Sequence, residues 1–252
     1  MRAEERHNVI LHLLNSHGQV TIADLSVRFA VSEMTVRRDL DQLAAKGALR
    51  RTHGGAARVS SGGVEPPFAV RAHLNAEAKR RIGRAVAGLL VDGQTVLLDG
   101  GSTAVAVADA LVGRDLTICT PSLHVAEVLA DSRPTRVMVT GGVIRPGERA
   151  LYGPATLRTL ADHRFDAYVM TASGLDLSAG CTEWNTDDAA TKRTGLEVSS
   201  TVIAACDSSK AGQVAFARIC GLDDLDVLVT DDGLSPDHQA ALRGHRLDLH
   251  LA

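Results

Sequence analysis

Hydroxyl and guanidinium groups that can bind phosphate oxygens or base edges are concentrated between residues 32 and 38. They belong to Ser32, Thr35, Arg37 and Arg38. At about 100° per residue, a helix through this segment places Val36, Leu40 and Leu43 on one face. Arg38 then lies nearly opposite. Arginines in the first two turns face the positive end of the helix dipole, and an external anion relieves that conflict. The segment therefore predicts a helix that packs by one face and offers its basic face to DNA.

Three further elements are expected to position this helix. A short helix over residues 20–29, with a tight turn at 30–31, precedes it, and an amphipathic helix around residues 9–14 lies upstream. Residues 47–55 are basic and rich in glycine, which is typical of a β-wing. The wing residues expected to contact the DNA backbone are Arg50, Arg51 and His53. Together these elements predict a winged helix-turn-helix within residues 1–58.

Downstream, short apolar runs alternate with helical patterns such as Ala78–Leu90 and Thr103–Leu111. The apolar runs are Thr95–Leu98, Leu116–Cys119, Arg136–Thr140, Ala167–Met170, Val202–Cys206 and Val227–Thr230. This alternation predicts a Rossmann-like α/β domain, in which helices cover both faces of a mainly parallel sheet.

Polar residues follow several of these runs, where ligands of open α/β sheets gather. Residues 99–103 combine an acid, two glycines and two hydroxyls at the start of a helix, which favours a phosphate. Residues 207–210 place an acid, two hydroxyls and an amine at another strand end. Thr120 and the pair Gly141-Gly142 follow two more strands. Each loop also has a plain alternative: a glycine turn with a serine cap, or a solvated loop.

Lysine usage adds a second indication. The chain has 23 Arg and four Lys, and the second domain holds Lys79, Lys192 and Lys210. A lysine is a compact point charge that suits a single phosphate or hydroxyl, whereas arginine imposes a planar fork. Coding bias explains the excess of arginine, and three lysines could also fall anywhere by chance.

Charge is divided unevenly along the 252 residues, whose formal net charge is −3. Residues 1–58 hold 9 Lys+Arg against 6 Asp+Glu, leaving 18 against 24 for residues 59–252. The basic charge is concentrated in the expected DNA-binding domain, as attraction to phosphates requires. We therefore expect a DNA-binding domain over 1–58, a linker rich in Gly, Ser and Pro over 59–74, and a second domain over 75–252.

Several protein classes are disfavoured. No apolar stretch approaches the roughly 18 residues of a membrane span, and the charged N-terminus lacks a signal-peptide core, so we expect a cytoplasmic protein with no membrane partner. The cysteines show neither C-x-x-C spacing nor Cys/His ligand spacing, and we expect buried thiols, no disulfide, no metal and no cofactor. They are Cys119, Cys181, Cys206 and Cys220.

The N-terminal pattern resembles the DeoR family of bacterial repressors. The resemblance runs from Arg6 and Ile10, through Ser32-x-x-Thr35-Val36-Arg37-Arg38-Asp39-Leu40, to His53-Gly54-Gly55. It continues, in order, through Glu77-Ala-Lys-Arg-Arg-Ile-Gly83, Asp99-Gly-Gly-Ser-Thr103, Gly141-Gly142, Leu151-Tyr-Gly153, Ser173-Gly-Leu-Asp176 and Asp207-Ser-Ser-Lys210. Nearly the whole chain is covered.

The resemblance implies an effector domain similar in fold to ribose-5-phosphate isomerase and the coenzyme A transferases, which binds phosphorylated sugars. It implies a phosphate held by Ser102, Thr103 and Lys79, with Asp99, Asp207 and Lys210 facing the sugar. All candidate effector-binding residues are Lys79, Asp99, Gly101, Ser102, Thr103, Thr120, Gly141, Gly142, Asp176, Lys192, Asp207 and Lys210.

Two positions depart from the family pattern. The family usually has Asn after the position of Thr120, where this chain has Pro121. A carboxylate, commonly Glu, precedes the Lys192-Arg193 pair in the family, and the candidates here are Asp187 and Asp188.

These observations predict a repressor of a carbohydrate uptake or catabolic operon. Its partners would be double-stranded operator DNA, a phosphorylated sugar or polyol, and further copies of itself in a dimer or tetramer. One alternative is an aldose–ketose phosphate isomerase fused to a DNA-binding domain, with Asp176, Asp187 or Asp188 as the base. Another is a regulator whose second domain only associates and binds no ligand.

Overall fold

The computed structural model describes residues 2–45, 48–57 and 65–252, and its contacts separate two units, Met1–Leu74 and Asn75–Ala252. Gly47 of the expected wing, Arg58, and residues 59–64 of the expected linker lie outside the described residues. The remainder of that linker segment includes a short helix, and its Val70 joins the hydrophobic cluster of the first unit.

The first unit is a winged helix-turn-helix, as expected. Its elements are α1 Ala3–His17, β1 Gln19–Thr21, α2 Ile22–Phe29, α3 Glu33–Ala45, β2 Arg50–Thr52, β3 Gly55–Ala57 and α4 Phe68–His73. Thr21 caps α2 by accepting a hydrogen bond from the Asp24 N–H, and the turn into α3 passes through Ala30 at φ 52°. The three strands pair antiparallel in the order β1-β3-β2. Val36, Leu40 and Leu43 are buried, as the helical spacing predicted.

The second unit is an α/β domain. Its helices are α5 Ala76–Leu89, α6 Ser102–Leu111, α7 Leu123–Leu129, α8 Pro154–Ala161, α9 Thr186–Glu197 and α10 Pro236–Leu242, with short turns η1 Ser208–Lys210 and η2 Leu222–Asp224. Its strands are β4 Thr95–Leu98, β5 Thr117–Thr120, β6 Arg136–Val139, β7 Val143–Arg145, β8 Ala150–Tyr152, β9 Phe165–Met170, β10 Gly174–Asp176, β11 Gly180–Glu183, β12 Ser199–Ala205, β13 Ala217–Cys220, β14 Val227–Thr230 and β15 Asp248–Leu251.

A seven-stranded sheet with the order β15-β14-β12-β9-β4-β5-β6 organises this unit, and every neighbouring pair in it is parallel. The chain begins at β4, runs outward through β5 and β6, and then returns to build β9, β12, β14 and β15 on the other side. The strand order therefore reverses between β4 and β9. In open α/β sheets, ligands bind at the carboxyl ends of the strands beside such a reversal.

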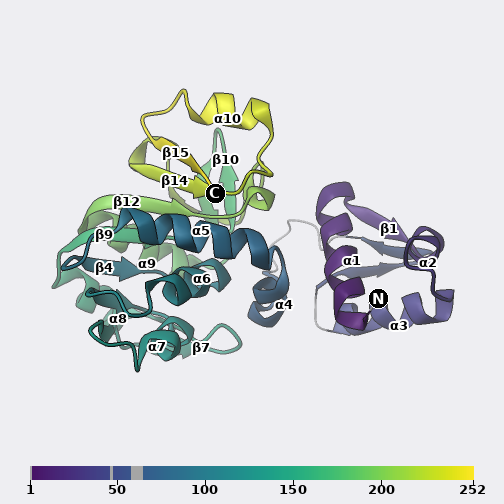
Figure 1. The fold of residues 1–252 in the computed structure, drawn as a ribbon, viewed down its shortest axis with the longest axis horizontal. Helices are drawn as coiled ribbons and strands as arrows, with labels where there is room; N and C mark the ends of the chain where they lie inside the picture. Colours follow the sequence, from purple (N-terminus) through teal and green to yellow (C-terminus); the bar gives the residue numbers. More distant parts are fainter. Residues whose placement is uncertain (1, 46–47, 58–64) are drawn as a thin grey trace. The chain divides into compact units, whose positions relative to one another are not determined.

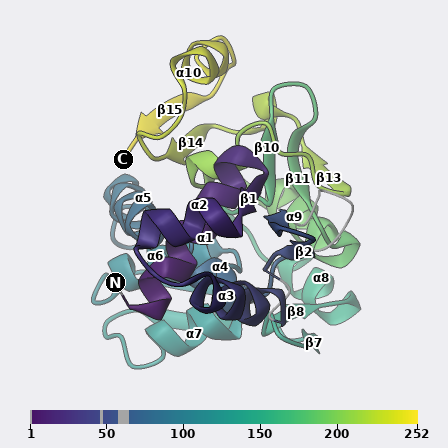
Figure 2. The ribbon, with the colours of Figure 1, turned by 90° about the vertical axis from the view of Figure 1, so that its right-hand side faces the viewer.

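Helices cover both faces of the sheet. One hydrophobic cluster joins α5, α6 and α7 to one face, and Figure 1 shows α5 and α6 in front of the strands. The other cluster packs α8 and α9 against the opposite face. Two small antiparallel sheets are added, β10-β11-β13 and the hairpin β7-β8, and Figure 2 shows the first of these beside α9.

The six strands expected from apolar runs are all present in the parallel sheet. The seventh strand, β15, was missed because Asp248-Leu-His-Leu251 alternates polar and apolar residues at a half-exposed edge. The antiparallel strands of the second unit were not predicted, because most of them are only three residues long.

Candidate functional site

The outward face of α3 carries the arginines that the sequence singled out. Arg37 and Arg38 are exposed, and Arg37 Nη2 lies 3.3 Å from Glu33 Oε2 in an exposed ion pair one turn apart. At the start of the helix, the Thr35 N–H donates to Ser32 Oγ at 3.3 Å, and the two hydroxyl oxygens are 3.0 Å apart. This face therefore presents two hydroxyls and two cations together.

The three wing residues differ in their surroundings. Arg50 and His53 are exposed, whereas Arg51 is partly buried and is held by two partners. Its Nε lies 2.9 Å from Asp41 Oδ1 on α3, and its Nη1 donates to the Gly55 carbonyl at 2.6 Å. Arg51 thus ties the wing to α3.

A buried ion pair between α1 and α3 was not predicted as such. Arg6 donates two hydrogen bonds, of 2.7 and 3.0 Å, to the Asp39 carboxylate. The Arg6 side chain is 10% exposed and the Asp39 side chain 5%. His7 Nε2 adds a contact of 3.2 Å to the same carboxylate. The hydrogen bond to Asp39 raises the pKa of Arg6. The sequence could have indicated this pair, because Asp39 falls on the apolar face of the helix and a buried acid requires a cation as partner.

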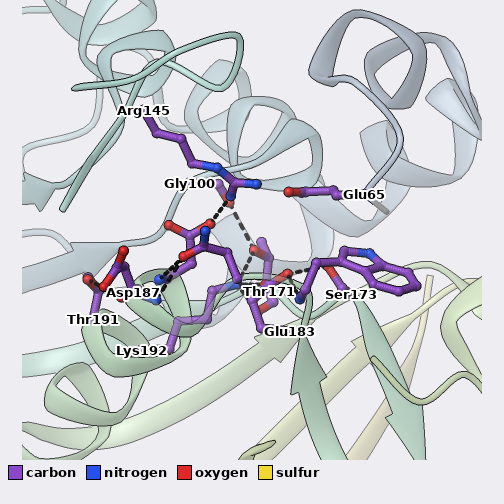
Figure 3. A network of polar contacts seen from close by, with 12 residues as sticks. Glu65, Gly100, Arg145, Thr171, Ser173, Glu183, Asp187, Thr191 and Lys192 are labelled. Carbon is purple, nitrogen blue, oxygen red and sulfur yellow. Dashed lines mark hydrogen bonds and ion pairs between the residues drawn. The ribbon is translucent and has the colours of Figure 1, made fainter. Parts of the chain in front are cut away.

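In the second unit, a buried polar network joins the loops on either side of the point where strand order reverses (Figure 3). Asp99 follows β4 and Thr171 follows β9, and both the N–H and the hydroxyl of Thr171 donate to Asp99 Oδ2 at 2.9 Å. Lys192 reaches in from α9, with Nζ 3.1 Å from Asp99 Oδ2 and 2.5 Å from Glu183 Oε2. It also donates to the Thr171 carbonyl at 2.8 Å.

The charges of this network stabilise one another. Burial acts to raise the pKa of Glu183, but Lys192 and hydrogen bonds from Ser173 and the Trp184 N–H outweigh it and hold that pKa below its usual value. Burial acts to lower the pKa of Lys192, but Asp99 and Glu183 raise it overall. Lys192 thus stays protonated and connects the loops that follow β4 and β9. The two carboxylates that pair with it are Asp99 and Glu183. The two acids suggested by the family pattern, Asp187 and Asp188, lie in the first turn of α9.

A second cluster surrounds Asp207 after β12. Asp207 Oδ1 accepts hydrogen bonds from Asn75 Nδ2 at 2.8 Å and from Ser209 Oγ at 2.5 Å. Burial acts to raise the pKa of Asp207, but Lys210 and Lys79 outweigh it and lower that pKa. Two cations and one buried carboxylate therefore lie near this strand end.

The glycine loops occupy neighbouring strand ends. Gly101 precedes α6 at φ 94°, a backbone conformation that residues other than glycine rarely adopt. Among the described residues, no side chain forms a capping hydrogen bond at the start of this helix. Ser102 and Thr103 form its first turn. A Cβ on Gly142 would lie 2.3 Å from Thr156 Oγ1, so that loop requires glycine.

Two of the candidate residues have local structural tasks. The Thr120 hydroxyl is buried and accepts from the Ser122 N–H at 3.1 Å. Asp176 Oδ1 accepts from the N–H groups of Ser178 and Ala179 at 2.9 and 2.8 Å, which shapes the turn between β10 and β11. The structure thus brings Asp99 and Lys192 into contact and groups Lys79 with Asp207 and Lys210. The side chains of Thr120 and Asp176 instead accept hydrogen bonds from the turns that follow their strands.

Within the described residues, no three or more His, Cys, Asp or Glu side chains lie close enough together to hold a metal ion. All four cysteines are free and buried. Among the residues described, no helix is both long and apolar enough to cross a membrane.

Family models match both units of the chain. The model of a DeoR-like helix-turn-helix domain matches residues 6–62, and that of the DeoR C terminal sensor domain matches residues 74–232. The glycerol-3-phosphate regulon repressor of Escherichia coli is 34% identical over 252 residues, covering 100% of both chains. The transcriptional repressor AccR of Agrobacterium fabrum is 35% identical over 91% of this chain and 90% of that protein.

One solved structure illustrates the more distant likenesses. Ribose 5-phosphate isomerase A from Methanocaldococcus jannaschii is 13% identical and aligns with a TM-score of 0.41 over 54% of this chain and 55% of that chain.

Proposed function

The chain belongs to the DeoR family of transcriptional regulators, and we propose that it represses a carbohydrate operon under the control of a phosphorylated sugar or polyol. It is a DNA-binding regulator with a sensor domain, and not the isomerase considered as an alternative. The observation that supports the DNA-binding half is the cluster at the start of α3, where the partly exposed Thr35 lies beside the exposed Ser32, Arg37 and Arg38. The loops that follow β4 and β9, where the strand order reverses, support the proposal that the second unit binds an effector.

For the operator, we propose that α3 enters the major groove and that Arg50, Arg51 and His53 contact the backbone from the wing. Replacing Arg37 and Arg38 together by alanine is expected to cost about 1–3 kcal/mol for each base contact removed. Fluorescence anisotropy with operator DNA at several salt concentrations measures the loss. Arg84→Ala, an exposed arginine of α5, is the matched control. Unchanged operator affinity in the double variant would refute the assignment of α3.

We propose that Arg51 contributes to DNA binding in part by holding the wing in position. Its ties to Asp41 and Gly55 hold the wing against α3, so phosphate contact is combined with a positioning role.

For the effector, we propose a phosphate at the start of α6, with the hydroxyl-bearing part toward the Asp207 cluster. The unoccupied N–H groups and the dipole of a helix start favour an anion, and Lys210 adds a charged partner. Relatives of similar identity include a glycerol-3-phosphate regulon repressor, which makes a small phosphorylated polyol the first compound to try.

Lys210→Ala is expected to weaken binding by about 1.5–3 kcal/mol, roughly ten- to a hundredfold. Ser102→Ala is expected to weaken it in the same direction. Calorimetry against sugar phosphates, sn-glycerol 3-phosphate and their unphosphorylated parents measures this, and Ser200→Ala, an exposed serine of β12, serves as control. The proposed phosphate site would be refuted if a phosphorylated compound and its unphosphorylated parent bound equally well. It would also be refuted if neither substitution changed the affinity for the best ligand.

We further propose that the second unit supplies self-association, since one small helix-turn-helix makes too few contacts for tight specific binding. Sedimentation of the full chain is expected to show a dimer or tetramer, and footprinting should reveal repeated half-sites about one helical turn, or a multiple of it, apart. A monomer that protects a single half-site with full affinity would contradict this proposal.

A further inference from the structure

One large apolar side chain lies among the polar groups at the start of α3. Met34 is the second residue of that helix and is 67% exposed. The hydrophobic cluster of the first unit takes Val36, Leu40 and Leu43 from α3, and Met34 is not among its described members. Packing within the unit therefore does not account for a long apolar residue at this position.

The neighbours of Met34 on the helix surface are residues that we propose to contact DNA. Residues three and four positions apart lie side by side on a helix, which places Arg37 and Arg38 beside Met34. The hydroxyl oxygens of Ser32 and Thr35, 3.0 Å apart, lie at the same end of the helix. A surface that binds these polar groups therefore also meets the apolar side chain of Met34.

The position of Met34 favours contact with base edges over contact with phosphates. In helix-turn-helix proteins, the N-terminal residues of the second helix of the motif reach base edges in the major groove, whereas the first helix crosses the DNA backbone. A thioether carries no hydrogen-bond donor and only a weak acceptor, so it matches an apolar group better than a polar base edge. The apolar group that a base pair presents in the major groove is the 5-methyl group of thymine.

Building on the proposed entry of α3 into the major groove, we propose that Met34 contacts a thymine 5-methyl group and selects thymine at one position of each operator half-site. The unbranched side chain has three rotatable bonds and a polarizable sulfur, so it can fit closely over a methyl group. Another base at this position presents polar groups without the methyl, and Met34 would separate those groups from water without replacing their hydrogen bonds. Attraction to thymine and exclusion of other bases thus act together.

Deoxyuridine tests this contact, because it differs from thymidine only by the absence of the 5-methyl group. The duplex that the full chain selects from random-sequence DNA supplies the target, and each thymine in it is replaced in turn by deoxyuridine. Fluorescence anisotropy then compares the wild type with Met34→Ala. At the contacted position, the replacement is expected to weaken wild-type binding roughly three- to fivefold, as the loss of one buried methyl group predicts. Met34→Ala should bind both duplexes equally well.

A matched control lies on the other helix of the motif. Val27 is an exposed apolar residue of α2, and Val27→Ala should keep the wild-type preference at every position. Met34→Leu remains apolar and is expected to retain the preference for thymidine, whereas Met34→Gln has a similar length and a polar end and should lose it. Because the contact involves no charge, the ratio between the two duplexes should be the same at low and high salt.

The proposal is overturned if every deoxyuridine replacement affects the wild type and Met34→Ala equally, or if Val27→Ala loses the same preference. The proposed function fails separately. If the double variant Arg37→Ala/Arg38→Ala keeps wild-type affinity for the selected duplex, the assignment of α3 is wrong. If that double variant binds weakly while no thymine depends on Met34, only the role of Met34 is wrong.

Discussion

Replacing Lys192 by Met is expected to lower the free energy of unfolding of the second unit by about 3–5 kcal/mol, because it leaves buried carboxylates without their cation. Asp99 and Glu183 are only 6% exposed and both lie within 3.1 Å of Lys192 Nζ. Urea unfolding followed by Trp184 emission measures the loss. Lys210→Met, which alters a half-buried lysine of the same unit, is the control and should cost much less.

A triple variant tests the reason for that loss. Adding Asp99→Asn and Glu183→Gln to Lys192→Met removes the buried charges altogether, and part of the lost stability should return. The effect should also depend on pH. Because the folded pKa of Glu183 is lowered, its charge stabilises the wild type above the ordinary carboxyl pKa, and that contribution disappears as pH falls through the folded value. If Lys192→Met unfolds at the wild-type urea concentration, the network does not stabilise the unit.

Asp39→Ala is expected to destabilise the first unit by a similar amount, about 3–5 kcal/mol, since it removes the carboxylate that is ion-paired with the buried guanidinium of Arg6. A unit of this size has little stability to lose, so α1 and α3 should exchange their amide hydrogens rapidly and operator binding should fail. Hydrogen exchange measured by mass spectrometry resolves the two units, and the second should be unaffected.

Asp41→Ala provides the comparison for Asp39→Ala. Asp41 is 65% exposed and pairs with Arg51, so its loss should cost less than about 1 kcal/mol. Equal protection of α1 in the Asp39 and Asp41 variants would show that the buried pair has no special weight.

Periodic apolar patterns made most of the fold predictable. The α3 pattern and five of the six apolar runs correspond to elements with buried residues, because each lies against a core and the packed face decides the residue spacing. The sixth run forms β6, a partly exposed strand at the edge of the sheet. The short antiparallel strands β7, β10 and β11, of three or four residues, have no such pattern, since tertiary contacts select their conformation.

The candidate site was predictable only where its residues follow strands. Asp99 and Asp207 could be located this way, because the carboxyl ends of parallel strands meet at one edge. Glu183 and Arg145 come from antiparallel strands that the sequence did not reveal, so their contacts with Lys192 and Asp188 depended on the three-dimensional arrangement. For the same reason, the sequence indicated Asp176 as a candidate but did not reveal that its carboxylate accepts hydrogen bonds from the turn after β10.

The division of α3 into two faces has an evolutionary consequence. Val36, Asp39 and Leu40 face inward and are constrained by packing and by Arg6. Met34 and Arg38 face outward and can mutate with little effect on stability. On the proposed role of α3, descendants of one ancestral gene can therefore acquire new DNA targets through a few surface mutations while the same scaffold and sensor are inherited unchanged.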